Sequence, residues 1–527
     1  MGGGRGVGGG ACGVCRAASS LTCGGCGDMY YCGKDHQRRH WAQHRPLCRP
    51  YKEVVDPELG RYLVASRRLK AGQEVMEDQP LTFGPLALTS PVCLGCHSPV
   101  PLEMPRCPGC WWPLCSPECA TSSLHQQECQ VLAKDTERVA PPREHEETAR
   151  YDIIMILRVL LLRSSDPEGW AVVCSMEHHN EKRRKGSELE LEMTTYLVQD
   201  VFGLDYTVEE LEQVRGAILT NAMQIRSPTE VSLRVLHPRV RLFNHSCSPN
   251  LQLSFTDDAV MLVRTAVPME IGDPLLVTYT GTTMPLWERH AILKENYFFD
   301  CECSRCHDPT EMGTNFSNPR CPECNWRIMQ PCRWLGTIKW VCQNCKGEKS
   351  EERVRNEAMA SLSSLEMSDV VEGKSFRRMQ YFLDQMETDY HPMHYVWMKV
   401  AQRMLSRLQD DETDRGLKLR VSIWRKLMVL YGKLEPGLTR RRGMSILELG
   451  LSIMRSVRIE YKISNLYIGY LIEQMKSAIE YFQEAEDIMS LEPPRARVHM
   501  LANRARQRKE EAKELMETLR ADAAQVK

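Results

Sequence analysis

The sequence predicts an α+β multidomain protein in which a β-rich core is joined to small zinc modules and to a C-terminal α-helical domain. Three observations predict this class. The 527 residues exceed what one hydrophobic core serves, so three or four folding units are expected. All 23 cysteines lie before residue 346, and seven C-x2-C pairs account for fourteen of them. Beyond Glu351 cysteine is absent and apolar residues recur at helical spacing.

Composition restricts the class of protein further. With 42% hydrophobic and 26% charged residues the chain is typical of globular proteins, and a net charge of −1 gives no overall field that would hold nucleic acid. The longest apolar run, residues 153–162, contains Arg158 and is too short to span a bilayer. C-x2-C thiols chelate metals readily, so we expect a reducing compartment, cytoplasm or nucleus. We also expect a monomer and no membrane partner.

Changes in pattern divide the chain into eight segments. These are a flexible Gly-rich tail (1–11), a first zinc module (12–50), a first strand-rich part (51–92), a second zinc module (93–133), a linker followed by a helical insert (134–230), the main strand-rich part (231–299), a third cysteine region (300–350) and a helical domain (351–527).

Periodicity supports the individual elements. Residues 59–85 alternate apolar and polar side chains around an Ala71-Gly72 turn, which predicts two or three strands. Residues 153–161 place apolar side chains on one helical face, and so do residues 423–431, whose helix should end at Pro436-Gly437. Residues 504–520 predict a charged, solvated helix.

Each zinc module carries eight potential ligands, enough for two closed tetrahedral sites. The first module contains Cys12, Cys15, Cys23, Cys26, Cys32, His36, His44 and Cys48, and the second contains Cys93, Cys96, Cys107, Cys110, Cys115, Cys119, His125 and Cys129. Cys32 and His36 are four residues apart, so both project from one face of a short helix. His40 competes as a ligand, although the spacing favours His44.

The most specific sequence in the chain is Arg241-Leu-Phe-Asn-His-Ser-Cys-Ser-Pro-Asn250. Alone it would be a polar turn after a strand. It is followed by Gly272-Asp-Pro-Leu-Leu-Val-Thr-Tyr279 and then by Tyr297-Phe-Phe-Asp-Cys-Glu-Cys-Ser-Arg-Cys306. This ordered trio resembles the SET domain of protein lysine methyltransferases, and together with the zinc modules it resembles the SET and MYND domain family. The doubled modules and His36 suggest the arthropod branch of that family.

The resemblance implies how the metal ligands pair. In a MYND finger the first, second, fifth and sixth ligands share one zinc ion and the remaining four share the other. It also implies that Cys247 joins Cys301, Cys303 and Cys306 in a post-SET zinc site, although a small buried core residue is the alternative for Cys247. Cys321, Cys324, Cys342 and Cys345 form a further four-cysteine knuckle, which brings the expected total to about six zinc ions. Cys174 and Cys332 remain as ordinary thiols.

The resemblance further implies S-adenosylmethionine-dependent N-methylation of a lysine in a histone or non-histone protein. Tyr279 would lie beside the transferred methyl group, and Tyr297 would line the channel that holds the lysine. Asn244 and His245 would bind the cofactor, and Phe299 would stack on its adenine. The remaining cofactor candidates are Gly60, Arg61, Tyr62, His179 and Asn221. A helix-capping role for Asn221 and a solvated loop position for His179 are the alternatives.

One position departs from the family pattern. The first cofactor loop of the family is Gly-Arg-Gly, whereas this chain has Tyr62 in place of the second glycine. Tyr62 does not easily adopt positive φ, so it either weakens cofactor binding or faces the core as a strand residue.

Two other functions therefore stay open. One is a catalytically weak or inactive SET scaffold that binds proline-rich partner peptides through its MYND fingers. The other is nucleic-acid binding through Arg38, Arg39 and Arg45, which the neutral charge balance does not favour. The C-terminal helices resemble the tetratricopeptide-like cap of the family and would wall the substrate cleft.

Overall fold

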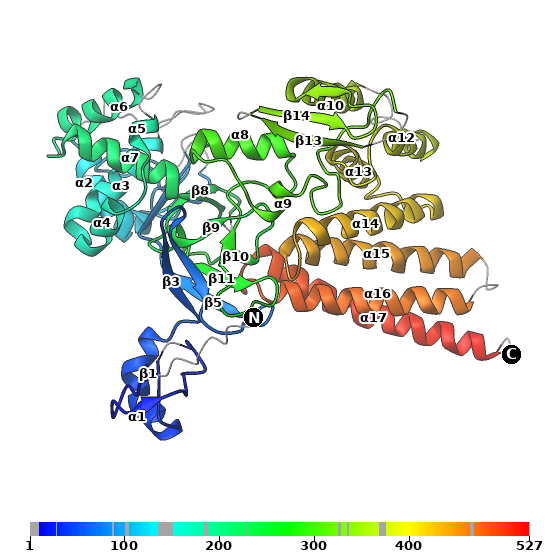
Figure 1. Cartoon of the computed structure of the whole chain (residues 1–527), viewed down its shortest axis with the longest axis horizontal. Helices are drawn as coiled ribbons and strands as arrows, with labels where there is room; N and C mark the ends of the chain where they lie inside the picture. The colour runs from blue at the N-terminus through cyan, green and yellow to red at the C-terminus, as the bar shows by residue number, and fades with distance from the viewer. Residues whose placement is uncertain are drawn as a thin grey trace, which may run out of the picture.

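The computed structural model confirms the α+β multidomain class. It describes residues 10–27, 29–86, 89–100, 105–134, 151–183, 188–227, 229–324, 328–334, 337–367, 376–463 and 468–525. A core of short strands lies at the centre, with a helical insert on one side and a helical C-terminal region on the other (Figure 1). The first zinc module projects from the core as a separate lobe. No helix in these described ranges is both long and apolar enough to cross a bilayer.

The central core is built from short strands paired into small sheets. Its strands are β3 (Tyr51–Asp56), β4 (Gly60–Ala65), β5 (Glu74–Asp78), β6 (Thr82–Pro85), β7 (Met223–Arg226), β8 (Ser232–Leu236), β9 (Asn244–His245), β10 (Leu251–Phe255), β11 (Met261–Thr265) and β12 (Leu276–Val277). They pair as β3-β4, β10-β11-β5 and β6-β8-β7, all antiparallel. The strands predicted over residues 59–85 are therefore β4, β5 and β6, and Gly72, at φ 77°, occupies the predicted turn.

Strands β9 and β12 pair in parallel at the centre of this core, and this paired segment is called the strand crossing. Asn244 pairs with Leu276 and His245 pairs with Val277. The Asn250 side chain secures the crossing, because its Oδ1 accepts from the Leu276 N–H at 2.9 Å and its Nδ2 donates to the Pro274 carbonyl at 2.8 Å. The crossing brings Tyr279, two residues beyond β12, next to the 243–247 segment.

The helical insert shares one hydrophobic core with the second zinc module. The second module contains η2 (Pro117–Thr121) and α2 (Ser123–Leu132), and the insert contains α3 (Asp152–Ser165), α4 (Pro167–Cys174), α5 (Asn180–Arg183), α6 (Glu188–Thr195), η4 (Tyr196–Val201) and α7 (Val208–Asn221). The sequence predicts one apolar face for α3, but α3 is buried on nearly every side because β6, α2, α4 and α7 surround it. Residues 135–150 of the predicted linker lie outside the described ranges.

The first zinc module has a very small core. It contains β1 (Gly10–Ala11), β2 (Ala18–Ser19), α1 (Lys34–His44) and η1 (Arg45–Leu47). Among the residues of this module that the structure describes, the buried apolar ones are Cys12, Cys23, Cys26 and Tyr31. So little apolar burial cannot offset the entropy of folding, so bound metal is expected to supply most of the stability. Gly10 and Ala11, assigned to the flexible tail from sequence, form β1, while residues 1–9 lie outside the described ranges.

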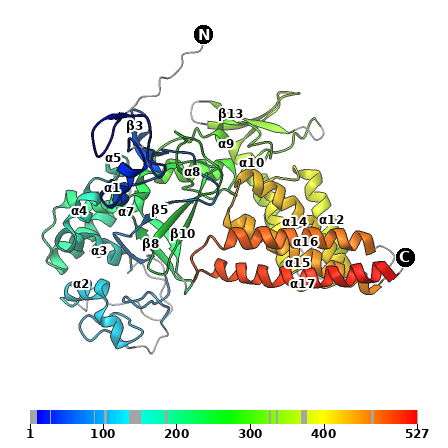
Figure 2. The ribbon, with the colours of Figure 1, turned by 90° about the horizontal axis from the view of Figure 1, so that it is seen from below.

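The third cysteine region and the C-terminal helices complete the chain. Their elements are α9 (Ser304–His307), β13 (Met329–Trp334), β14 (Thr337–Cys342), β15 (Glu348–Ser350), α10 (Glu351–Met367), α12 (Phe376–Asp389), α13 (Tyr395–Arg407), α14 (Asp414–Leu434), α15 (Arg440–Ile463), α16 (Ile468–Met489) and α17 (Arg497–Gln525). The main strand-rich part that precedes them also contains η5 (Val240–Leu242) and α8 (Leu286–Asn296). Figure 2 shows α15, α16 and α17 running side by side away from the strands.

The predicted break after α14 is also the point where the helical region docks on the strands. Gly437 has φ 88°, and a Cβ there would lie 2.0 Å from the Ala266 carbonyl oxygen, so only glycine fits. The Leu438 N–H donates to the same carbonyl at 2.8 Å. Arg440 then donates to the Leu253 carbonyl and pairs with Glu492.

Candidate active site and metal clusters

Within the part of the chain that the structure describes, six groups of potential metal ligands have their ligand atoms within 4.8 Å of one another, and five of them consist of four cysteine and histidine side chains that the sequence predicts. These five are Cys12/Cys15/Cys32/His36, Cys23/Cys26/His44/Cys48, Cys93/Cys96/Cys115/Cys119, Cys107/Cys110/His125/Cys129 and Cys247/Cys301/Cys303/Cys306. These groups match the interleaved pairing that the family resemblance implies. His40 stands outside them, because its Nδ1 lies 2.9 Å from the Tyr31 hydroxyl.

The spacing within the groups fits zinc. Four thiolates at about 2.3 Å from a tetrahedral ion would lie roughly 3.8 Å apart. Observed sulfur–sulfur distances are 3.2 Å for Cys15–Cys32, 3.7 Å for Cys23–Cys48 and 4.0 Å for Cys247–Cys301. In the predicted knuckle, Cys321 and Cys345 lie 3.5 Å apart, and Cys345 also contacts the thiols of Cys324 and Cys342.

Hydrogen bonds prepare the Cys107 thiol of the second module for a metal. Burial alone raises the pKa of Cys107, but contacts with His125, the N–H groups of Cys110 and Gly109, and the Cys129 thiol lower it to about 6. Since metals bind the thiolate, a lowered pKa favours the ligating form at neutral pH. His125 in turn lies with its Nδ1 3.4 Å from Glu128, the carboxylate support that metal-binding histidines usually have.

The fifth cluster lies at the strand crossing, where Cys247 is fully buried. Arg289 donates from Nε to the Cys247 sulfur at 3.2 Å and from Nη2 toward the Cys306 sulfur at 3.7 Å. Arg305 donates to the Cys247 carbonyl at 3.2 Å, and Glu311 pairs with both arginines at 3.0 and 3.1 Å. Four thiolates around a divalent ion carry two negative charges, so this buried Arg–Glu–Arg group partly compensates them.

Close contacts among these four thiols shift their pKa values in opposite directions. Contacts with Cys247 and Cys301 lower the pKa of Cys303 to about 6. The pKa of Cys306 is also lowered by its thiol neighbours, whereas that of Cys301 is raised by Cys247, Cys303 and Cys306. Four thiols this close cannot all ionise without a cation, which is the chemistry expected of a metal site.

Tyr279 and His245 are locked together beside this cluster. The Tyr279 N–H donates to His245 Nδ1 at 2.9 Å, and the Tyr279 hydroxyl donates to the Phe243 carbonyl at 2.6 Å. The other ring nitrogen of His245 lies 3.3 Å from the Cys247 sulfur. Both nitrogens of the ring are thus engaged within the protein, so the ring orients Tyr279, and any contact from His245 to a ligand would come from its main chain.

Aromatic side chains cluster around the Tyr279 ring. The rings of Tyr279 and Tyr297 are 4.8 Å apart, and those of His245 and Phe299 are 6.0 Å apart. Burial, followed by the proximity of Tyr297, raises the pKa of Tyr279, and burial also raises that of Tyr297. Both phenols therefore stay protonated at neutral pH and can donate hydrogen bonds.

His179 and Asn221 both contact Glu177 near the end of α7. The Asn221 side chain donates to the Glu177 and Ala217 carbonyls, each at 2.8 Å, so it joins the insert loop to the helix end. His179 packs edge-on against Phe298 at 5.2 Å. The contact of Asn221 with Ala217 is the kind that the helix-capping alternative describes, whereas His179 is half-buried and is not a freely solvated loop residue.

The Gly60–Tyr62 loop connects to these residues indirectly. Gly60, at φ 71°, forms the β3–β4 turn, and Tyr62 is a half-buried strand residue paired with Val54. Arg61 lies close enough to lower the pKa of Arg241, an effect second to that of burial. Arg241 donates to the Ser175 carbonyl at 3.0 Å, which links the loop to the insert.

Sequence reasoning missed the arginines that connect these parts. Arg158, Arg183, Arg289 and Arg305 each join segments far apart in the chain. Arg305 precedes Cys306 in the third quoted motif, where only the cysteines were assigned a role, and the other three arginines lie outside the quoted motifs. Only Arg158 gave a signal, as the one charge within an apolar run.

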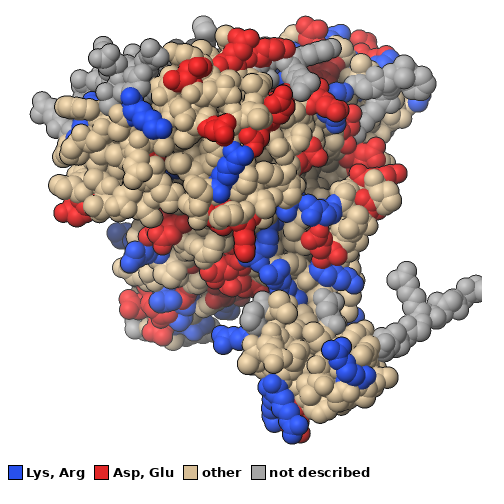
Figure 3. Space-filling model, turned by 90° about the vertical axis from the view of Figure 1, so that its left-hand side faces the viewer, with Lys and Arg blue, Asp and Glu red and all other residues tan. Residues whose placement is uncertain are grey.

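The first module presents a different kind of surface. Figure 3 shows its lobe with several basic side chains and little acidic colour. Its exposed basic residues are Arg16, Lys34, Arg38, Arg39, Arg45 and Arg49. Trp41 and Leu47 are 42% and 67% exposed on the same lobe, so apolar and basic groups are both available to a partner.

Comparison with known families agrees with this geometry. The family model described as the MYND finger matches residues 12–48, and the one described as the SET domain matches residues 60–280. The fruit-fly SET domain-containing protein SmydA-8, isoform B, is 25% identical over 395 residues, which are 70% of this chain and 83% of that protein.

More distant relatives include enzymes by name. The Arabidopsis histone-lysine N-methyltransferase ASHR1 is 23% identical over 467 residues, 82% of this chain and 90% of that one. Mouse protein-lysine N-methyltransferase SMYD4 is 41% identical over 96 residues, 18% of this chain and 11% of that one. A crystal structure of the SET domain of LSMT bound to lysine and AdoHcy covers 79% of this chain and 90% of that one at 11% identity with a TM-score of 0.28, a loose likeness.

Proposed function

Because this chain is a SET and MYND domain-containing protein, we propose that it transfers the methyl group of S-adenosylmethionine to a lysine of a histone or non-histone protein. The observation that supports this most is the placement of Tyr279. Its hydroxyl is oriented by the Phe243 carbonyl, its backbone N–H is held by His245, and its ring lies 4.8 Å from that of Tyr297.

The residues present fit the cofactor and the substrate. Asn244 and the main chain of His245 would hold S-adenosylmethionine, with the Phe299 ring available to its adenine. When bound, the cofactor supplies an electrophilic methyl group on a sulfonium. Methyl transfer needs alignment of two reactants more than it needs acid or base, so rigid placement of the surrounding side chains is the contribution of the protein.

The aromatic residues would prepare the amine. A lysine in water has a pKa of about 10.4 and is protonated at neutral pH. Walls formed by Tyr279 and Tyr297 exclude water and disfavour the ammonium form, which lowers the pKa of the lysine. Because both phenols stay protonated, neither adds a negative charge that would stabilise the ammonium.

We propose six zinc ions as structural components. Five sets of ligands are the cysteine and histidine groups named above, and the sixth is the Cys321, Cys324, Cys342 and Cys345 knuckle. The number of thiols in these sets also favours a reducing compartment, cytoplasm or nucleus, which fractionation of cells expressing the tagged chain would test.

Calorimetry with S-adenosylmethionine and with its demethylated product tests the proposal. Micromolar binding that Asn244→Ala abolishes and Asn503→Ala, on the exposed side of α17, preserves would support it. Transfer of labelled methyl groups to a protein array, lost in Tyr279→Phe but kept in the exposed Tyr381→Phe, would support catalysis. Absence of binding at millimolar cofactor would instead leave a scaffold.

Partner binding through the first module is a second function, favoured by the exposed Trp41 and Leu47. Proline-rich peptides suit such a surface because they are extended and lose little entropy on binding. Titration of a proline-rich peptide library against the chain and against Trp41→Ala would test this function without reference to catalysis.

A further inference from the structure

Arg183 joins the helical insert to the segment that follows α8. Its Nη2 donates to the Asn296 carbonyl at 2.5 Å and to the Thr220 hydroxyl at 3.1 Å. Its guanidinium also lies 4.9 Å from the centre of the Phe298 ring, within the range of a cation–π contact. One side chain therefore contacts α7, the end of α8 and the residues beyond it, which we call the lid segment (residues 297–299).

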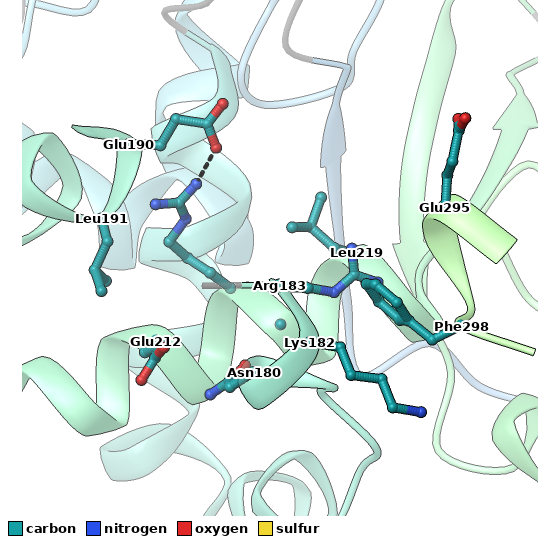
Figure 4. A pocket seen from close by; sticks show the side chains of 11 residues that line it. Asn180, Lys182, Arg183, Glu190, Leu191, Glu212, Leu219, Glu295 and Phe298 are labelled. Atoms are coloured by element: carbon teal, nitrogen blue, oxygen red, sulfur yellow. Dashed lines mark hydrogen bonds and ion pairs between the residues drawn. The ribbon is translucent and has the colours of Figure 1, made fainter. Parts of the chain in front are cut away.

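Phe298 needs such support because its backbone is unfavourable. Its φ is 60°, in the left-handed region where the Cβ of a residue with a side chain crowds the following carbonyl oxygen. The ring is held by His179 edge-on at 5.2 Å, by Arg183 and, at 5.9 Å, by Lys182. Figure 4 shows Arg183 and Phe298 overlapping at one end of a cavity that insert helices line on the other side.

The two neighbours of Phe298 are the aromatic residues of the active site. Tyr297 packs against Tyr279, and Phe299 approaches His245. Because the three lid residues are consecutive, a Phe298 held in this conformation fixes the directions of Tyr297 and Phe299. Burial raises the pKa of Tyr297, and the Arg183 charge opposes that rise, which places the two groups close together.

We propose that Arg183 is a positioning residue that clamps the lid segment to the insert and so preorganises both the cofactor wall and the lysine channel. This inference rests on the proposed methyltransferase function. It assigns to the insert a role that no motif in the sequence indicates. The same arginine donates to Thr220, the neighbour of Asn221. One side chain therefore fixes the position of the lid segment relative to the end of α7.

Arg215 offers a matched control. It lines the same cavity, lies on the adjacent helix α7 and pairs with Glu190 within the insert. If the substitutions acted only by enlarging the cavity or changing its charge, variants of Arg183 and of Arg215 would have equal effects on the lid segment. A clamp on the lid would act at Arg183 alone.

Hydrogen–deuterium exchange of the zinc-loaded full chain is the first measurement. We expect a peptide covering residues 294–300 to exchange at least fivefold faster in Arg183→Ala than in the wild type, with Arg215→Ala unchanged. Arg183→Lys keeps the charge but cannot donate in the same two directions, so it should fall between them. If Arg183→Ala does not fold, Phe298→Leu removes the ring beneath the guanidinium and permits the same comparison.

Cofactor calorimetry and steady-state kinetics on the same proteins form the second measurement. Arg183→Ala should raise the Kd of S-adenosylmethionine about tenfold and lower kcat, with thermal stability close to that of Arg215→Ala. Unchanged lid exchange in Arg183→Ala, or equal acceleration in Arg215→Ala, would overturn the clamp. A wild-type chain that binds no cofactor would refute the methyltransferase proposal alone, because lid exchange is measured without ligand.

Discussion

Arg158 and Glu128 form a bidentate ion pair in the core between the second zinc module and the insert. Nε to Oε2 is 2.6 Å and Nη2 to Oε1 is 2.7 Å, with both side chains almost completely buried. The same guanidinium reaches the Leu94 and Phe83 carbonyls and His97. The second module is thus part of the insert core, whereas the first module is a projecting lobe.

Removal of one partner of this pair should destabilise the protein strongly. Glu128→Gln leaves Arg158 as an uncompensated buried charge, which costs about 3–5 kcal/mol. We expect urea unfolding of the zinc-loaded chain to show a loss of that size. Arg226→Met, which breaks an exposed pair with Glu230, should cost less than about 1 kcal/mol. Equal losses for the two variants would contradict a structural role for the second module.

Arg289 should control zinc retention at the strand crossing. Arg289→Met removes the donor to the Cys247 and Cys306 sulfurs, so the affinity of that site for zinc should fall roughly tenfold or more. Native mass spectrometry after mild chelation should then find one zinc ion fewer than in the wild type. Arg305→Met is the control, because Arg305 shares Glu311 but donates to carbonyls and not to thiols. Loss of zinc from both variants alike would show that general destabilisation, not the sulfur contact, is responsible.

His394 should make stability depend on pH. Burial, and to a smaller extent His391 and Arg320, lowers its pKa from 6.5 to about 3. Below pH 6.5 His394 binds a proton in the unfolded chain but not in the folded chain. The stability that neutral His394 contributes is therefore complete above pH 6.5 and is lost as the pH falls toward 3. Between these two pKa values the free energy of unfolding changes by about 1.4 kcal/mol per pH unit. His394 should therefore make the free energy of unfolding about 2 kcal/mol smaller at pH 5 than at pH 7.

The measurement compares unfolding of the wild type and of His394→Asn at both pH values with zinc in excess. Asparagine preserves the N-cap that His394 provides to the Val396 N–H but does not titrate. The pH dependence of the variant should be weaker by the stated amount. Parallel pH profiles for the two proteins would rule out His394 as the source.

The division between what the sequence could and could not predict follows from the range of each interaction. Ligands such as Cys12 and Cys15 are local pairs, and their spacing alone indicates chelation. Cys247 lies 54 residues from Cys301, and only the family resemblance united them before the structure did. The α+β class was predictable because cysteine clusters, strand alternation and helical periodicity occupy separate parts of the chain.

Arg183 and Arg289 could not be predicted in this way. Arg183 is 113 residues from Asn296, and Arg289 is 42 residues from Cys247. A single arginine within a helix has no periodicity, and a surface position is its usual location. The burial of α3 on nearly every side was missed for a related reason, because periodicity reports one face and not how many neighbours surround it.

Tyr62 tests whether the departure from the family loop matters. In the β3–β4 hairpin, positive φ occurs at Gly60, while Tyr62 lies in regular strand conformation opposite Val54. A second glycine is therefore not needed for the backbone to adopt this shape. Tyr62→Gly should bind S-adenosylmethionine within about twofold of the wild type and should lose about 1 kcal/mol of stability, because glycine weakens a strand. Tyr62→Ala separates the two effects, since it removes the ring without freeing the backbone. A tenfold gain in cofactor affinity in both variants would mean that the ring obstructs the site; the same gain in Tyr62→Gly alone would mean that the bound loop needs the freedom of glycine.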